Sequence, residues 1–184
     1  MFFNYIAGIQ EVDKEKVKIN HRDAVRAVIL SGNDILMVHN NKGDYKFPGG
    51  GANNGESHNQ TLIREVREEA GYIVSDVKDK IGVFTERKFD DKDENSIFEM
   101  TSYYYECEIS KDKTIQQLDD YEEQLDFKPV WISLDEAIRL NEEILRNKND
   151  INSWVYRETS ALIAIRVAFK EKVAFHHPLT LQTD

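Results

Sequence analysis

The feature that most constrains this chain is a run of three glycines followed closely by a helix crowded with acids. The segment 49–72 reads GGGANNGESHNQTLIREVREEAGY. Ser57 and Gln60 form a capping-box pattern, and Gly71 suits the position just after a helix end. We therefore predict a helix from about His58 to Ala70, with both of its ends set by the sequence.

One face of this helix should be apolar and the adjoining face acidic. At about 100° of rotation per residue, four apolar residues form one stripe: Leu62, Ile63, Val66 and Ala70. Glu65, Glu68 and Glu69 fall together beside it. Acids four residues apart repel each other by roughly 0.2–0.5 kcal/mol, and a cation between them would turn that repulsion into attraction. A solvated face with ion pairs such as Arg64 with Glu68 is the alternative interpretation.

The glycines favour a binding site. Glycine lets the backbone approach a ligand closely, so the loop FPGGGANNGE and the helix are expected to form one site. The loop is not a phosphate-binding P-loop, because Glu56 stands where that motif requires a lysine. Phosphates would therefore have to bind together with a metal cation.

These residues resemble the Nudix box, GX5EX7REUXEEXGU, in which U is aliphatic. Gly50 is followed after five residues by Glu56, and after seven more by REVREEAGY at 64–72. The resemblance covers 23 residues, Gly50 to Tyr72, and holds at every fixed polar and glycine position. Tyr72 stands where the pattern has an aliphatic residue. On these residues the chain is identified as a member of the Nudix hydrolase family.

The resemblance implies an α/β/α sandwich around a mixed β-sheet. It also implies a pyrophosphohydrolase that cleaves a nucleoside diphosphate linked to another moiety X, with Mg²⁺ or Mn²⁺ as cofactor. By motif position, Glu65 and Glu69 are the expected metal ligands, and Glu68 is a ligand or orients one. The Gly50 carbonyl completes the metal shell, and Arg64 positions a glutamate. Hard divalent cations do prefer such carboxylate oxygens.

The general base and the substrate contacts lie outside the fixed positions of the motif. Arg22 and Arg26 share one face of an expected strand, because side chains alternate along a strand, and they are candidates for binding phosphate. Solvated surface arginines are the alternative. Of the tyrosines at 103–105, at least one should point into the core while another could stack on a base. Besides the box glutamates, four residues stay open as the base: Glu106, Glu108, Glu122 and Glu123.

The rest of the chain predicts one domain, 1–184, with its core at about 23–147 and a last helix at about 153–171. Strands are expected at 23–30, 35–40, 73–89, 96–109 and 128–134, and another helix at 133–147. The acidic segment 111–127 has no predicted element. Helices mixed with strands in this order indicate α/β layers around a mixed sheet.

The net charge and the cysteine count exclude several classes of binding partner and of site. There are 34 acids against 24 lysines and arginines, a net charge of −10, which argues against a nucleic-acid polymer or an anionic membrane. Cys107 is the only cysteine, so neither a disulfide framework nor a thiolate zinc cluster can form. The N-terminal segment is not expected to be a signal peptide, and no 18-residue apolar run follows it. We expect a cytoplasmic protein with a small phosphorylated substrate. The family resemblance implies that this substrate is a nucleotide and that a homodimer is possible.

Two alternatives stay open. A non-catalytic Nudix-like domain could sense a nucleotide, although such domains usually lose box acids and this chain keeps them all. An isomerase acting on an isoprenyl diphosphate would need a catalytic cysteine, for which only Cys107 is available.

Overall fold

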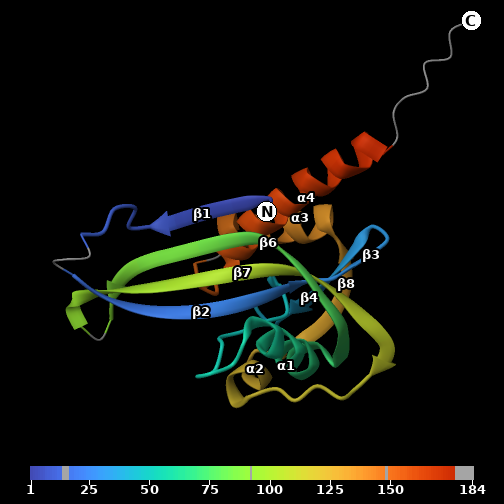
Figure 1. Ribbon diagram of the computed structural model, residues 1–184, viewed down its shortest axis with the longest axis horizontal. Helices are drawn as coiled ribbons and strands as arrows, with labels where there is room; N and C mark the ends of the chain where they lie inside the picture. Colours follow the sequence, from blue (N-terminus) through green and yellow to red (C-terminus); the bar gives the residue numbers. More distant parts are fainter. Residues whose placement is uncertain (14–16, 92, 148, 177–184) are drawn as a thin grey trace, which may run out of the picture.

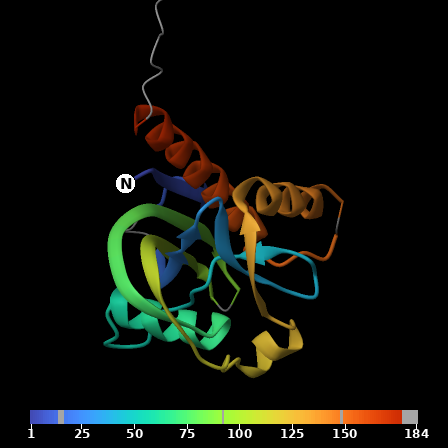
Figure 2. The same ribbon diagram turned by 90° about the vertical axis from the view of Figure 1, so that its right-hand side faces the viewer.

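Two four-stranded β-sheets form the middle layer of the protein, with α3 (Leu134–Asn147) and α4 (Val155–His176) on one side and α1 (His58–Ala70) and α2 (Asp120–Gln124) on the other (Figures 1 and 2). This is the expected α/β/α sandwich. The computed structural model describes residues 1–13, 17–91, 93–147 and 149–176, so the remaining positions of the predicted domain 1–184 lie outside the described residues.

The strands are β1 (Phe3–Gly8), β2 (Lys18–Val28), β3 (Leu30–Ser31), β4 (Asp34–His39), β5 (Tyr45–Lys46), β6 (Tyr72–Asp90), β7 (Asp93–Lys113) and β8 (Lys128–Ser133). The five predicted strands correspond to β2, β4, β6, β7 and β8, and the structure adds β1, β3 and β5. β6 and β7 form a long antiparallel hairpin rich in aromatic and β-branched residues, which favour strands. β1 and β2 flank this hairpin as parallel partners of β6 and β7, so this sheet is mixed.

The second sheet contains β3, β4, β5 and β8 and is joined to the first through the chain at Ile29. The strand expected at 23–30 is divided: its part up to Val28 belongs to β2 and pairs with β7, and only Leu30 and Ser31, as β3, pair antiparallel with β4. Leu36 N donates to the Ile29 carbonyl at 3.0 Å and fixes this corner. β2 is therefore an edge strand of the first sheet, beside which the glycine loop can lie.

The predicted helix α1 is confirmed, including both caps. Gln60 N donates to Ser57 Oγ and Ser57 N donates to the Gln60 side chain, while Gly71 adopts the left-handed φ of 68°. The predicted apolar stripe was wrong at Ile63, which is 46% exposed. The buried face is instead centred nearer to Glu65 and Glu69, because the glycine loop covers the acidic side of the helix.

The hydrophobic core lies on both faces of the first sheet. Leu162 and Ile165 of α4 are fully buried against β6 and β7, and Tyr104 is the tyrosine that points into this core. The last helix begins at Val155 and runs to His176, beyond the predicted end. Within the described part of the chain, no helix is long and apolar enough to span a membrane.

Candidate active site

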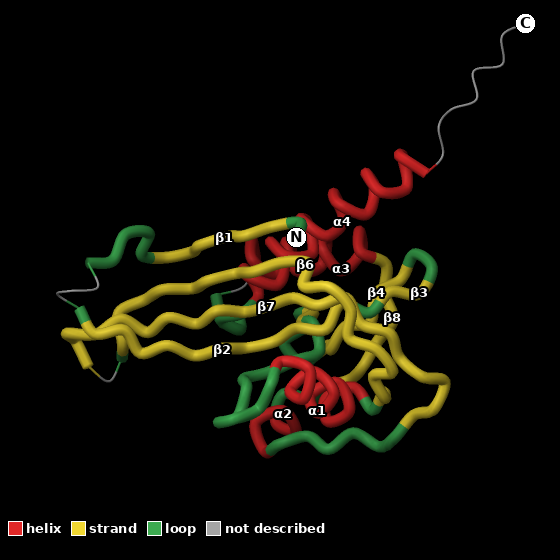
Figure 3. Tube along the Cα trace, in the orientation of Figure 1, coloured by secondary structure: helices red, strands yellow, loops and turns green. Residues whose placement is uncertain are grey.

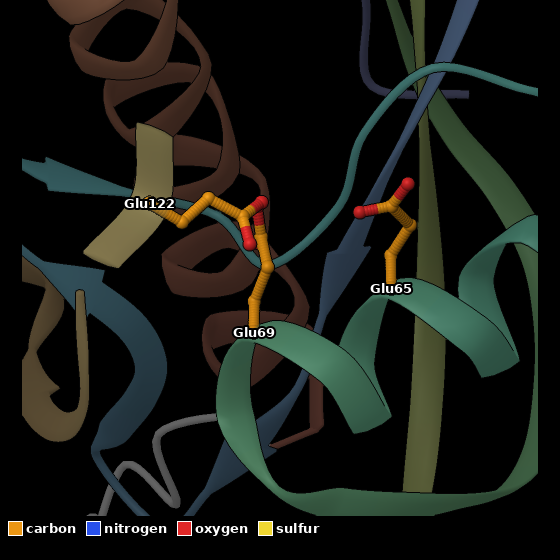
Figure 4. A group of neighbouring side chains, drawn as sticks. All are labelled: Glu65, Glu69 and Glu122. Atoms are coloured by element: carbon orange, nitrogen blue, oxygen red, sulfur yellow. The ribbon is translucent and has the colours of Figure 1, made fainter. Parts of the chain in front are cut away.

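Three glutamates from two helices meet beside the glycine loop. Glu65 and Glu69 of α1 and Glu122 of α2 each offer a carboxylate oxygen, and these oxygens lie within 4.8 Å of one another. Figure 4 shows the Glu122 carboxylate against that of Glu69, with Glu65 one helical turn away. We call these three residues the acidic trio. Glu65 and Glu69 are buried and Glu122 is partly buried.

Glu122 is the one of the four predicted base candidates that reaches this group. Its short helix α2 is fixed by a capping box, in which Asp119 N donates to Glu122 Oε2 at 3.0 Å. The sequence pattern Asp119 to Glu122 could have predicted this helix, which was missed. Glu106, Glu108 and Glu123 lie outside the trio, and Glu108 forms an ion pair with Lys78 instead.

Arg64 donates hydrogen bonds to three glutamates of the segment 50–72. Its Nε and Nη2 each donate to Glu56 at 2.9 Å, and its Nη1 donates to Glu65 at 2.7 Å and to Glu68 at 3.1 Å. This geometry links three glutamates through Arg64, whose positioning role stays a prediction. It leaves Glu68 outside the trio, bound to the arginine. Glu56 holds the loop to the helix, since it also accepts from Asn53 N at 3.0 Å, and these bonds lower the pKa of Glu56 from 4.5 to about 2.

Lys46 is a functional candidate that reasoning from the sequence did not single out. β5 carries it into the site, where its ammonium group forms an ion pair with Glu69 and lies 4.8 Å from the centre of the Phe127 ring. Both Lys46 and Glu69 are buried. Gly49 N donates to the other Glu69 oxygen at 2.9 Å. Glu69 is thus held between a cation and the glycine loop.

The glycine loop has no room for side chains at the site, and at Gly50 the obstacle is an acid. A Cβ on Gly50 would lie 2.4 Å from Glu65 Oε1, so the Glu65 carboxylate occupies the space beside that backbone. Gly49 has a φ of 142°, which side chains disfavour. The Gly50 carbonyl accepts from Val25 N at 2.9 Å and retains one lone pair for a further contact.

The electrostatics of the trio indicate a shortage of positive charge. Burial and the neighbouring charge of Glu69 raise the pKa of Glu65. Burial, with a further contribution from Glu69, raises the pKa of Glu122 to about 7. Desolvation and the like charges of the cluster raise these pKa values although Arg64 contacts Glu65 and Lys46 contacts Glu69. The donor set therefore fits a hard divalent cation such as Mg²⁺, which prefers carboxylate oxygens.

A cleft of about 350 Å³ opens beside the trio. Four cationic side chains line it: Arg22, Arg26, Lys46 and Arg157. The two predicted arginines of β2 therefore reach the same cleft. Arg22 is exposed, whereas Arg26 is buried and donates to the Gly49 carbonyl. Arg26 also lies 3.6 Å from the buried carboxylate of Glu158, so it anchors the loop as well as facing the cleft.

The aromatic side chains at the cleft are Tyr121, Phe127 and Trp154, and the tyrosines at 103–105 are not among its lining residues. Tyr104 lies in the core, and the hydroxyl of Tyr105 is bonded to His58 at the start of α1. The stacking predicted for those tyrosines therefore has no support here.

The isomerase alternative requires a catalytic cysteine at the cleft, and Cys107 is not among the residues that line it. Cys107 is buried in the core beneath α1, and burial raises its thiol pKa to about 12.

Comparison with known proteins identifies the fold. The family model described as NUDIX domain matches residues 20–155. A NUDIX hydrolase from Nitrosomonas europaea is 18% identical with a TM-score of 0.57, and the match covers 82% of this chain and 91% of that one. An ADP-ribose pyrophosphatase from Streptococcus suis is 17% identical with a TM-score of 0.53, over 81% and 92%. A structure described as an ADP compounds hydrolase is 17% identical with a TM-score of 0.52, over 82% and 74%. No curated protein matches the chain in sequence.

Proposed function

This chain belongs to the NUDIX domain family of pyrophosphohydrolases, and from that premise we propose that it is an Mg²⁺-dependent hydrolase of a nucleoside diphosphate linked to another moiety X. The observation that carries the proposal is the acidic trio, short of positive charge and next to a cleft lined by cations. Two structural relatives are described as acting on ADP-ribose or ADP compounds, which supports a nucleotide substrate.

We assign the metal to Glu65 and Glu69, with the Gly50 carbonyl nearby. A divalent cation bound there would screen the diphosphate charge and make phosphorus more open to attack by water. Manganese suits the same oxygen ligands. Glu68, bound to Arg64, is assigned the role of orienting the box rather than of a direct ligand.

The chain's own residues would do the remaining work. Glu122 is the proposed general base, because its carboxylate faces the site and its raised pKa of about 7 suits a group that accepts a proton from water near neutral pH. Arg22 and Arg26 would bind the phosphate oxygens, and Arg26 would hold the glycine loop in place at the same time. Lys46 orients the Glu69 carboxylate through their ion pair.

The intact trio argues against the non-catalytic sensing alternative, since a domain that only binds a nucleotide has no need of a base beside its metal ligands. A cytoplasmic location, a homodimer and a single domain over 1–184 stay predictions.

The test is hydrolysis of a panel of nucleotides with Mg²⁺, followed by chromatography of the products. The panel holds nucleoside triphosphates, oxidised dGTP, ADP-ribose, dinucleoside polyphosphates and nucleotide sugars. Glu122→Gln should lower kcat by a hundredfold or more, and Glu69→Gln should do so while the protein stays folded. Glu123→Gln is the matched control, because Glu123 is exposed, adjacent in sequence and outside the trio. Equal activity of the Glu122 and Glu123 variants would disprove the assignment of the base.

A further inference from the structure

Beside the cleft, the strands of the first sheet extend past the helices. Figure 3 shows β2, β6 and β7 running on together, with β1 next to them, where no helix covers their ends. A second cavity of about 310 Å³ lies here. We call this the sheet shelf and define it by five of its lining residues: Ala7 of β1, Glu86 and Lys88 of β6, and Phe98 and Met100 of β7.

The sheet shelf and the catalytic cleft adjoin each other. Met100, Ser153 and Arg157 line both cavities. Arg157 is buried and held from two sides, by an ion pair with Glu86 of the shelf and by two hydrogen bonds to Glu158. A fixed positive charge therefore marks the boundary, which is where the charged middle of a ligand reaching into both cavities would pass.

The chemistry of the cleft differs from that of the shelf. Cations and carboxylates line the cleft, which suits phosphates and their metal, and the aromatic rings of Tyr121 and Trp154 line it as well. The shelf carries the partly buried Phe98 and Met100. Apolar surfaces with a few polar groups are typical of sites for organic ligands.

The volumes of the cleft and of the shelf cavity favour a ligand that occupies both. Binding sites for small molecules usually span about 300–1,000 Å³, so each cavity alone stands near the lower limit. Together they offer about twice that space. A nucleoside triphosphate ends in phosphate and has no organic group there to contact Phe98 and Met100 of the shelf.

We propose that X is an organic group, a sugar or a second nucleoside, and that it binds on the sheet shelf against Phe98 and Met100. This rests on the proposed function. The nucleoside binds at the Tyr121 and Trp154 end, and Glu86 and Ser153 provide hydrogen-bonding groups for hydroxyls of X. In hydrolysis, water bonds to one phosphorus and the bond from that phosphorus to the bridging oxygen breaks. The products are a nucleoside monophosphate and phosphorylated X, and the two protons of water pass to these products or to solvent.

Phe98 and Phe89 offer a matched pair of variants. They lie on the same extended hairpin, but Phe98 lines the shelf, whereas Phe89 is 70% exposed and pairs in register with Ile97, so it points to the opposite face. Phe98→Ala should lower kcat/KM for ADP-ribose or a nucleotide sugar at least tenfold, mainly through KM, and change that for nucleoside triphosphates less than twofold. Phe89→Ala should change neither. Met100→Ala is the second variant if thermal unfolding shows that Phe98→Ala is not folded.

Binding measured by calorimetry separates this inference from the proposed function. With Ca²⁺ in place of Mg²⁺ to slow turnover, the protein should bind ADP-ribose or a nucleotide sugar at least tenfold more tightly than a nucleoside triphosphate. Phe98→Ala should remove that preference. A protein that binds with this preference but never hydrolyses would refute the proposed function alone. Equal or weaker binding of the two-ended compounds, or a preference that survives in Phe98→Ala, would overturn the assignment of the shelf.

Discussion

The buried carboxylate of Glu158 is the best point at which to test how the cleft is supported. It is fully buried on α4 and accepts hydrogen bonds from Phe47 N at 3.0 Å and from Arg157 at 3.0 and 2.8 Å. Arg26 lies 3.6 Å away with its Nε unbonded. Glu158→Gln keeps the shape of the side chain but removes the negative charge that these two arginines face.

The expected loss of stability follows from these contacts. Removing one partner of a buried ion pair costs roughly 3–5 kcal/mol, because the opposite charge stays buried without compensation. Arg157 retains Glu86, and glutamine can still accept from Phe47 N, so we expect about 3 kcal/mol. In a chain of this size each kcal/mol lowers Tm by about 2–4 °C, which gives a decrease of roughly 6–12 °C.

Thermal and urea unfolding followed by circular dichroism would measure this loss. Glu143→Gln is the control, since Glu143 forms an exposed ion pair with Arg139 and should cost less than about 1 kcal/mol. Activity of Glu158→Gln should also fall, because Arg26 anchors the glycine loop. A variant as stable as the control would refute the reasoning, since it would mean that the arginines do not depend on the Glu158 charge.

Three further changes test the site itself. Gly50→Ala should lower kcat at least tenfold, because the new Cβ would lie 2.4 Å from Glu65 Oε1 and displace it; a normal rate would contradict that packing. Adding Mg²⁺ at about 100 times its Kd should stabilise the protein by about 2.7 kcal/mol in thermal unfolding, and Glu69→Gln should abolish most of this gain. Glu56 has its pKa lowered in the folded state, so its contribution is present above pH 4.5 and lost as pH falls towards about 2. Urea unfolding should therefore show a stability gap between wild type and Glu56→Gln at pH 6 that narrows at pH 3, and a gap independent of pH would exclude the ionised pair with Arg64.

The sequence predicted those features of the site that depend on local chemistry. Helix α1 was found with both ends correct because its caps are made by nearby residues, Ser57 with Gln60 and Gly71 with Arg67. Ile63 was misplaced because periodicity reports the apolar side of a helix, whereas here the neighbouring loop buries the acidic side.

Features that depend on distant contacts could not be read from the sequence. Four glutamates were equal candidates for the base, and only the approach of α2 to α1 distinguishes Glu122. Lys46 looks like any surface lysine in the sequence, and its burial against Glu69 depends on how β5 packs. The arginines of β2 were placed on one face correctly, because alternation along a strand is local, but the anchoring role of Arg26 needed Glu158 from the last helix.

The parallel pairing of β1 with β6 and of β2 with β7 also has a consequence for how the protein folds. Parallel neighbours require long intervening loops to close before any pairing energy is gained, which slows folding. Formation of the cleft depends on the same long-range contacts. The hydrogen bond between Phe47 and Glu158 joins residues 111 positions apart in the sequence, and the bond between His21 and Glu99 joins residues 78 positions apart. Catalytic activity should therefore return in refolding experiments only with the slowest phase, after the native sheet has formed.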